Sequence, residues 1–256
     1  MPGWLVGVGR CVDLTVQVLR AAVTPPYSYG AELVEEFRFA VKRAWLAMMI
    51  TAFAFAFGPA GVQGAGFLEL FGALDRLGGL YSIFIVREFA PLVVAIIVAG
   101  VVGTAVCADL GARKVREELD ALNVLGVETV RSIVVPRFLV IVLIGPLFLI
   151  FGIIAGTAGA AVVVIQNHTA LGPFMAGFWD HANTVELLGA YVKTAIFGVV
   201  IASVSCYKGL SVSGGPEGVG RAVNQTVVIS FLLIGAVDYL YGQLLLASVP
   251  ALSEIR

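Results

Sequence analysis

The chain has 256 residues, of which 59% are hydrophobic and only 13% are charged, and its formal net charge is −1. An ordinary soluble domain is nearer half apolar and one quarter charged, so this composition, with a mean hydropathy of +0.98, excludes that class and indicates an integral membrane protein. The function therefore has to be one that works inside lipid, and we expect no nucleic-acid partner.

Residues 1–43 are too polar to span a bilayer, and we expect them to form a cytoplasmic or interfacial segment. Apolar residues share one face of a helix and polar residues share the other: Leu5, Val8, Val12, Val16 and Leu19 against Arg10, Asp13, Gln17 and Arg20. Such a helix is typical of the membrane interface, and a helix packed on cytoplasmic protein is the alternative. Pro25 and Pro26 end it, and a second amphipathic turn over residues 32–43 leads into the membrane.

Five segments are long and apolar enough to cross the membrane, at residues 44–67, 80–108, 138–165, 187–207 and 222–247. The third is the clearest, because it contains no charged side chain and about 20 apolar residues suffice to span the hydrocarbon core. The first is ambiguous, because Gly58 and Pro59 follow its apolar part, so a kinked span and a re-entrant segment both fit. We predict an all-α integral membrane protein in which residues 44–256 form one domain with five transmembrane helices.

Lysine and arginine are concentrated on one side of these spans. Twelve of the 16 basic residues fall there: Arg10, Arg20, Arg38, Lys42, Arg43, Arg113, Lys114, Arg116, Arg131, Arg137, Lys208 and Arg221. Cytoplasmic loops carry such an excess, so we expect a cytoplasmic N-terminus and, after an odd number of spans, an outer C-terminus. The three cysteines then lie on the reducing side as packing residues, and the two histidines form no metal motif.

The loop of residues 109–137 gives the strongest functional signal. We expect its residues 113–126 to form a short helix with an apolar face and a charged remainder, ended by a glycine: Val115, Leu119 and Leu122, then Arg113, Arg116, Glu117, Glu118 and Asp120, and finally Gly126. A helix resting on the bilayer surface is one interpretation. Anionic lipid would repel three acidic residues within four positions, however, which favours a cytoplasmic protein partner.

Four charged residues lie at similar depth in the outer half of the predicted spans: Arg87, Glu88, Lys193 and Asp238. A charge at the bilayer centre costs about 3 kcal/mol on insertion scales, so these residues need an explanation. One explanation is internal pairing, for example of Lys193 with Glu88. The other is a polar collar around an outward-opening cavity, which would bind a lipid headgroup while apolar residues hold the lipid tails.

Two stretches of the chain resemble the MlaE/YrbE family of ABC-type permeases, which are the membrane subunits of MCE lipid-transport systems. Residues 86–138 contain VREFAPLVVAIIVAG and AVCADLGARKVREELDALNVLGVETVRSIVVPRF, and residues 193–228 contain KTAIFGVV and CYKGLSVSGGPEGVGRAVNQTVV. The loop and the second stretch are similar to the actinobacterial A-type YrbE permeases that accompany Mce proteins.

The resemblance implies that this chain is the non-enzymatic permease subunit of an ATP-driven lipid transporter in the plasma (inner) membrane. A second permease chain would complete the lipid cavity, in a homodimer for Mla systems or a YrbEA–YrbEB heterodimer for Mce systems. A cytoplasmic ABC ATPase would use ATP and Mg and would dock on the loop helix as its coupling helix, while MCE-domain proteins would bind on the outer side. No cofactor is expected in this chain, which lacks the G-x-x-x-x-G-K-[ST] pattern of an ATPase.

The resemblance also bears on the lipid site. Arg87, Glu88 and Lys193 fall on family positions associated with lipid binding. Family members often carry a basic residue after the glycine that corresponds to Gly100, and here Val101 follows it, which suits a less polar lipid.

Other classes of function remain as alternatives, namely an ion-coupled secondary transporter and a non-catalytic membrane scaffold subunit. A secondary transporter predicts inverted repeats with broken helices near the midplane, and the sequence shows no internal repeat. A membrane enzyme would need a His, Asp or Ser constellation inside the membrane, whereas both histidines lie in an outer loop.

Overall fold

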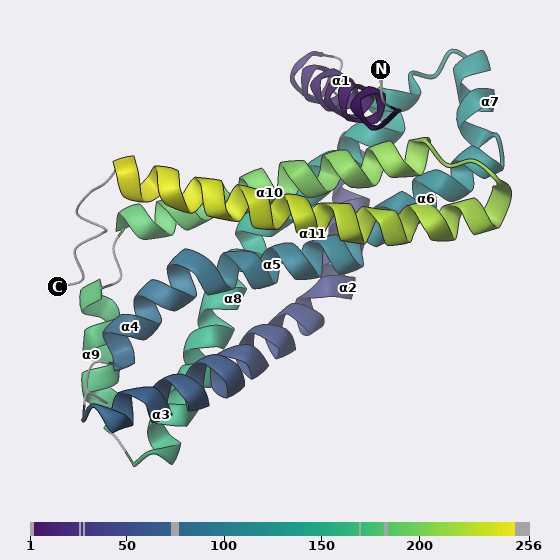
Figure 1. The fold of residues 1–256 in the computed structure, drawn as a ribbon. Helices are drawn as coiled ribbons and strands as arrows, with labels where there is room; N and C mark the ends of the chain where they lie inside the picture. Colours follow the sequence, from purple (N-terminus) through teal and green to yellow (C-terminus); the bar gives the residue numbers. More distant parts are fainter. Residues whose placement is uncertain are drawn as a thin grey trace. The chain divides into compact units, whose positions relative to one another are not determined.

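The computed structural model describes residues 3–25, 27, 29–72, 77–168, 170–181 and 184–248. These residues are helical almost throughout and include no strand, which confirms the all-α prediction. Five helical runs are long and apolar enough to cross a membrane: Gly30–Leu70, Leu77–Val115, Val130–Gln166, Thr184–Leu210 and Gly215–Ser248. The five predicted spans are therefore confirmed, and each run extends beyond the predicted bounds (Figure 1).

Several spans combine α-helix with short π-helical turns. The first consists of α2 (Gly30–Phe55), η1 (Ala56–Val62) and α3 (Gln63–Leu70). The second consists of α4 (Leu77–Ile83), η3 (Phe84–Phe89), α5 (Ala90–Ile97), η4 (Val98–Gly103) and α6 (Thr104–Val115). The third consists of η5 (Val130–Val134) and α8 (Val135–Gln166), the fourth is α10 (Thr184–Leu210), and the fifth is α11 (Gly215–Ser248). Outside the spans lie α1 (Gly3–Val23), α7 (Glu118–Val124) and α9 (Leu171–His181).

The first span is a single helical run, which answers the ambiguity at Gly58 and Pro59. Pro59 has no N–H to donate, and it lies inside η1, where the hydrogen bonding changes from the α to the π pattern. The hydroxyl of Tyr81 donates to the carbonyl of Ala56 at 3.0 Å and so satisfies one acceptor of this turn. The proline thus shifts the helical register without turning the chain back, as a re-entrant segment would require.

The chain packs as two compact units. Unit 1 contains Met1–Ala44, Ile96–Ile144 and Ile196–Val237, and unit 2 contains Trp45–Ala95, Gly145–Ala195 and Asp238–Arg256. Successive parts of the chain alternate between the units. The division into an interfacial segment, residues 1–43, and a membrane domain, residues 44–256, concerns membrane insertion and stays a prediction.

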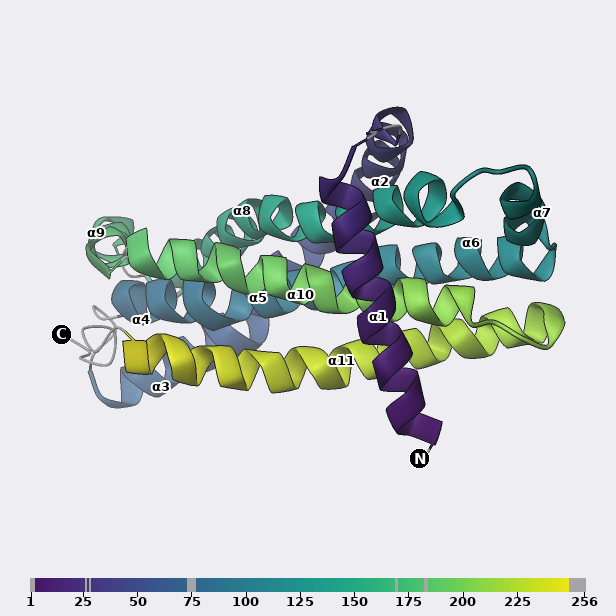
Figure 2. The same cartoon turned by 90° about the horizontal axis from the view of Figure 1, so that it is seen from above.

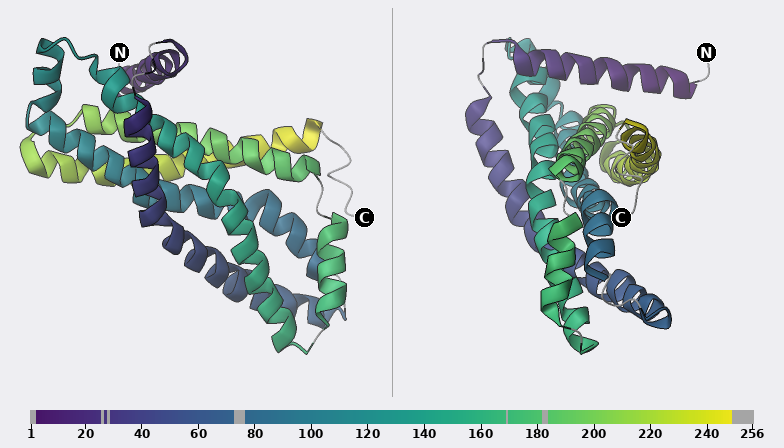
Figure 3. Two further views of the ribbon diagram at one scale, coloured as in Figure 1. Left: turned by 180° about the vertical axis from the view of Figure 1, so that it is seen from behind. Right: turned by 90° about the vertical axis from the view of Figure 1, so that its left-hand side faces the viewer.

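Within unit 1, α1 lies crosswise to α10 (Figures 2 and 3). Its contact face carries buried Val18 and Ala21, and the thiol of Cys11 donates to the carbonyl of Ser203 at 3.7 Å. The apolar stripe foreseen from the sequence stays exposed beside this face: Leu5, Val8, Val12, Val16 and Leu19. The predicted amphipathic helix is therefore present, and its apolar stripe is not used for packing within the unit.

Glycine allows the backbone of α10 to approach its neighbours in unit 1 closely. A Cβ placed on Gly198 would lie 2.8 Å from the Cα of Val142 in α8, and one on Gly209 would lie 3.0 Å from the carbonyl oxygen of Cys107 in α6. Small residues at such crossings are how membrane helices gain packing contacts, because lipid supplies no hydrophobic force between helices.

Unit 2 has an apolar core that includes α9, a helix in the loop that the sequence leaves unassigned. Tyr81, Ile85, Leu149 and Phe174 are buried together in this core. A Cβ on Gly78 of α4 would lie 2.1 Å from the carbonyl oxygen of Phe174 in α9, so the two helices meet backbone to backbone (Figure 1).

Candidate functional site

The charged residues predicted to share one depth in the membrane come together in unit 2. The ammonium of Lys193 lies 2.7 Å from a carboxylate oxygen of Glu88 and 2.7 Å from one of Asp238, and it donates to the carbonyl of Arg87 at 3.1 Å. The contacts with Glu88 and the Arg87 carbonyl are hydrogen bonds, and the contact with Asp238 is an ion pair. The Lys193 side chain is only 2% exposed, so this satisfaction is what makes its burial tolerable.

Arg87 has a partner that the sequence analysis missed, Glu186. Arg87 lies in the π-helical turn η3, Glu186 lies in α10, and their side chains form an ion pair and hydrogen bond. Glu186 and Lys193 are seven residues apart, two helical turns, so they lie on one face of α10 toward the adjacent residues Arg87 and Glu88. The seven-residue spacing is the signal from which the pairing could have been found.

This cluster has an excess of one negative charge when all its members are ionised, because two cations face three carboxylates. It encloses only about 10 Å³ of free space, which holds at most one water. Glu88 is its most accessible charged member, with 42% of its side chain exposed. The arrangement can therefore present a carboxylate to a ligand at the surface of the unit, but one chain does not enclose a lipid there.

The charged loop differs from the single helix predicted over residues 113–126. Arg113 belongs to α6, which continues the second span to Val115, and the chain then breaks at Glu117 before α7 begins. Glu117 has a φ of 60°, in the left-handed region that side chains rarely adopt, and this conformation is what ends one helix and starts the next. The helical residues of the predicted element are thus divided between two helices.

The outer surface of the loop is also different from the predicted apolar face. Leu119 is 3% exposed and packs inside the loop, so its side chain does not form an outward contact surface. The most exposed apolar residues of the loop are instead Val124 at 88% and Leu125 at 77%, at its apex, and Val115 of the predicted face is also exposed. Gly126 follows at a φ of 78° and ends α7, as predicted.

Four contacts tie α7 to both ends of the loop. Lys114 of α6 forms an ion pair with Asp120 of α7 at 2.9 Å. The hydroxyl of Thr129 contacts the side-chain oxygen of Asn123 and, at 3.4 Å, the carbonyl of Leu119. Arg116 and Glu118 pair on the exposed side at 2.7 Å. The loop is therefore an ordered projection from the second and third spans, with its two apolar apex residues uncovered.

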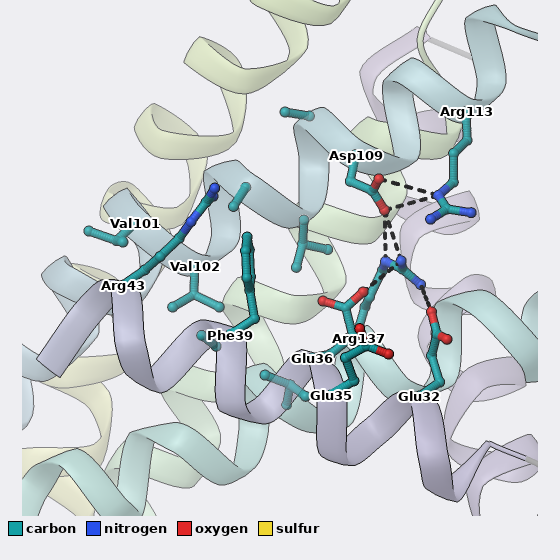
Figure 4. Close-up of a pocket in the computed structure, with 15 residues that line it drawn as sticks. Glu32, Glu35, Glu36, Phe39, Arg43, Val101, Val102, Asp109, Arg113 and Arg137 are labelled. Atoms are coloured by element: carbon teal, nitrogen blue, oxygen red, sulfur yellow. Dashed lines mark hydrogen bonds and ion pairs between the residues drawn. The ribbon is translucent and has the colours of Figure 1, made fainter.

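A second group of charges lies in unit 1 beside a cavity of about 600 Å³ (Figure 4). Arg137, at the start of α8, reaches Glu36 of α2 at 2.7 Å, Asp109 of α6 at 2.9 Å and Glu32 of α2 at 3.4 Å. Arg113 also pairs with Asp109, at 3.1 Å. The cavity wall combines these charges with apolar residues of α2, η4, α6 and α8. Arg137 entered the sequence analysis for its sign alone, because its partners Asp109 and Glu36 are distant in sequence, whereas Arg113 and Asp109 are a helical i, i+4 pair.

The described residues hold no group of His, Cys, Asp and Glu that could bind a metal ion. Cys107 and Cys206 are buried in unit 1, and Cys11 is half-buried. Burial raises the pKa of the Cys11 thiol, and nearby Lys208 opposes that shift. The cysteines thus occupy packing positions, as the sequence indicated.

Five apolar helices, an ordered charged loop and a buried ion-pair cluster define a multi-pass membrane protein. Comparison with known proteins makes the class specific, because the family described as Permease MlaE matches residues 33–244. A probable ABC transporter permease protein of Synechocystis sp. is 34% identical over 166 residues, 64% of this chain and 63% of that protein. A probable ABC transporter permease protein of Rickettsia typhi is 31% identical over 179 residues, 68% of each chain. The intermembrane phospholipid transport system permease protein MlaE of Haemophilus influenzae is 29% identical over 185 residues, 70% of each chain.

The chain therefore belongs to the MlaE permease family, as the resemblance in its sequence indicated. The alignments span about two thirds of the length of the first two relatives.

Proposed function

We propose that this chain is the permease subunit of an ATP-driven lipid transporter in the plasma (inner) membrane. The observation that carries the proposal is the family match over residues 33–244, which contains the charged loop and all or nearly all of each of the five spans. A relative in Haemophilus influenzae is named as a phospholipid transport permease, which supports lipid as the class of substrate. In this proposal ATP and Mg are bound by a separate cytoplasmic ABC ATPase, and this chain needs no cofactor of its own.

The charged loop is the proposed docking site for that ATPase. Arg113, Arg116, Glu117, Glu118 and Asp120 would supply polar contacts around the loop. The exposed apex of Val124 and Leu125 supports this role, because two uncovered aliphatic side chains beside an acidic helix suit a protein groove better than an anionic lipid surface. Leu119, Leu122 and Gly126 would act by shaping the loop.

The ion-pair cluster of unit 2 is the proposed lipid-headgroup site. Arg87, Glu88, Lys193 and Asp238 form a polar cluster on otherwise apolar helices, and Glu88 is its accessible member. Since one chain encloses no lipid-sized space at the cluster, the proposal requires a second permease chain to complete the cavity, as a homodimer or as a YrbEA–YrbEB pair. MCE-domain proteins would accept or deliver the lipid on the outer side, and the N-terminus and the charged loop would face the cytoplasm.

Reconstitution of the complex into liposomes tests this function. The purified permease with its ATPase should move a fluorescent phospholipid or fatty acid only when ATP and Mg are present, and the permease alone should hydrolyse no ATP. A matched variant of the ATPase that lacks its phosphate-binding lysine should abolish the transfer. Transfer by the permease alone, driven by an ion gradient, would show a secondary transporter instead, and no transfer under either condition would favour a scaffold subunit.

A further inference from the structure

Arg137 is a buried charged residue to which the proposed transport cycle assigns no role. It lies at the start of α8, and its side chain is only 2% exposed. Its Nε and Nη2 atoms contact Asp109 at 3.0 and 2.9 Å, Nη2 also contacts Glu36 at 2.7 Å, and Nη1 donates to the carbonyl of Ile133 at 2.9 Å (Figure 4). One guanidinium group is thus shared among three helices of unit 1.

These three helices have distinct places in the proposed cycle. Asp109 lies in α6, which leads into the α7 loop, and Arg137 lies in α8, which follows it. Glu36 lies in α2, the first part of the first span. Arg137 therefore fastens the two ends of the loop to each other and fastens both to the first span.

The contacts within the loop would pass its movement on to the joint, by which we mean the contacts of Arg137 with Asp109 and Glu36. The ion pair between Lys114 and Asp120 and the contact between Thr129 and Leu119 hold α7 against both of its connecting segments. A push on the apex of the loop would therefore displace the ends of α6 and η5 together. Beyond the ion pairs Arg113–Asp109 and Arg131–Glu128, this displacement reaches the Arg137 guanidinium, which also contacts α2.

The ion pairs of Arg137 also suit a contact between helices that move relative to each other. A buried ion pair adds little net stability, because desolvation offsets most of the attraction, but a planar guanidinium fixes the relative positions of the carboxylates it binds. Glu32 and Glu36 are four residues apart, so their carboxylates follow each other by about 6 Å along α2. Glu36 is in close contact at 2.7 Å and Glu32 at 3.4 Å, which gives α2 two places to hold Arg137 as it shifts.

We propose that Arg137 is a positioning residue that transmits movement of the α7 loop to the first span through Glu36. This inference rests on the proposed function, in which the ATPase moves the loop. It adds that the first span is driven directly from the loop, and it names the contact that does so.

Hydrogen exchange in the complex with its ATPase tests the joint without any lipid. The measurement compares nucleotide-free complex with complex bound to a non-hydrolysable ATP analogue, at residues 118–134 and 30–44. In the unmodified protein the exchange should change in both segments. In Glu36→Gln the change at 118–134 should remain, while the change at 30–44 should fall at least threefold. Glu36→Asp, which keeps the charge but shortens the reach, should give an intermediate loss.

Two further variants provide the controls. Glu32→Gln removes the longer contact and should weaken the response at 30–44 less than Glu36→Gln does. Glu217→Gln makes the same chemical change at an exposed position of α11 and should alter neither segment. A full response at 30–44 in Glu36→Gln would overturn the proposal. A parallel loss in both segments would also overturn it, because Glu36 would then be supporting the loop and not transmitting from it.

Lipid transfer per ATP hydrolysed separates this inference from the function on which it rests. Glu36→Gln should keep the ATPase bound and hydrolysing ATP, while lipid transferred per ATP falls at least threefold. If Glu36→Gln transfers as much lipid per ATP as the unmodified protein, the proposed role of the joint is wrong, while the transport function still stands. If the unmodified complex transfers no lipid but its exchange response still depends on Glu36, the joint stands and the lipid-transport function fails.

Discussion

Lys193 has no access to bulk water, so the protein must replace its hydration entirely. Two carboxylates and one backbone carbonyl do this, and they come from the second and fifth spans, while Lys193 itself lies in the fourth. Because three spans meet at one ammonium group, the residue both holds unit 2 together and defines its polar surface. A substitution there changes structure and ligand binding together, which an experiment has to separate.

Lys193→Met should destabilise the protein, because it leaves Glu88 and Asp238 without their shared cation. Breaking a buried pair costs about 3–5 kcal/mol, and the partial exposure of Glu88 places this case at the lower end. Adding Asp238→Asn removes one uncompensated carboxylate and should restore part of the loss. Thermal unfolding in detergent measures the stability, and Lys42→Met, at an exposed position, is the control.

The same variants separate packing from lipid binding. Co-purified lipid should stay low in the double variant, although its unfolding temperature partly recovers, because Glu88 still lacks the cation that holds its carboxylate in place at the surface of the unit. Lipid content that rises in step with stability would assign Lys193 a purely structural role. An unfolding temperature that does not change in Lys193→Met would show that water solvates the cluster.

Residue patterns predicted some partners at this scale and missed others. The pair of Lys193 and Glu88 could be foreseen, because only a few charges lie in the spans and they must neutralise one another. Glu186 was overlooked because it stood at the edge of a predicted loop, where a carboxylate needs no partner. Arg137 was counted only for its sign, since 28 residues separate it from Asp109 and 101 from Glu36.

At the scale of elements, hydropathy and length identified the five spans. The changes from α-helix to π-helix within a span, by contrast, have no recognisable pattern in the sequence. A span must bury its backbone polar groups and present apolar side chains, and both demands show in the sequence. The π-helical turns η3 and η4 lie within the second span, and neither length nor hydropathy distinguishes them from the α-helix around them. The break at Glu117 was missed for a similar reason, because glutamate has no preference for the left-handed region and glycine or asparagine would have been expected there.

The apex of the α7 loop yields a prediction about docking. Replacing both Val124 and Leu125 with serine should release the ATPase on co-purification, because it removes the exposed apolar contact. The unfolding temperature should be unchanged, because neither side chain is packed within the chain. Leu119→Asp is the contrasting variant: it places a charge in a buried position and should lower the unfolding temperature as well as docking. Retention of the ATPase by the double serine variant would move the docking site away from the apex.

The crossing of α10 and α8 yields a prediction about helix packing. Gly198→Ala places a methyl group 2.8 Å from the Cα of Val142, which is backbone and cannot rotate away. The helices must separate, and overpacking of this kind typically costs about 1–3 kcal/mol. Gly235→Ala in α11 is the matched control, because open space surrounds that position. The unfolding temperature should fall for Gly198→Ala only. Equal unfolding temperatures for the two variants would show that the crossing can accommodate an extra methyl group.

At the scale of the whole molecule, the two units sort the chain into alternating halves. Unit 1 contains the N-terminal helix, the charged loop and the connection from α10 to α11, and these are the segments in which the sequence concentrates lysine and arginine. The packing thus groups the basic segments into one unit. This grouping is the same whichever side of the membrane the unit faces. The orientation predicted from the charge asymmetry therefore needs its own measurement.

Thiol labelling in sealed membrane vesicles measures that orientation. Val124→Cys places a thiol at the exposed apex of the charged loop, and Trp179→Cys places one on the exposed side of α9. A membrane-impermeant maleimide should label the first variant only in inside-out vesicles and the second only in right-side-out vesicles. The native background is low, because Cys107 and Cys206 are buried and burial raises the pKa of Cys11, which leaves less reactive thiolate at neutral pH. Labelling of Val124→Cys in right-side-out vesicles would place the loop outside the cell, where no cytoplasmic ATPase could reach it.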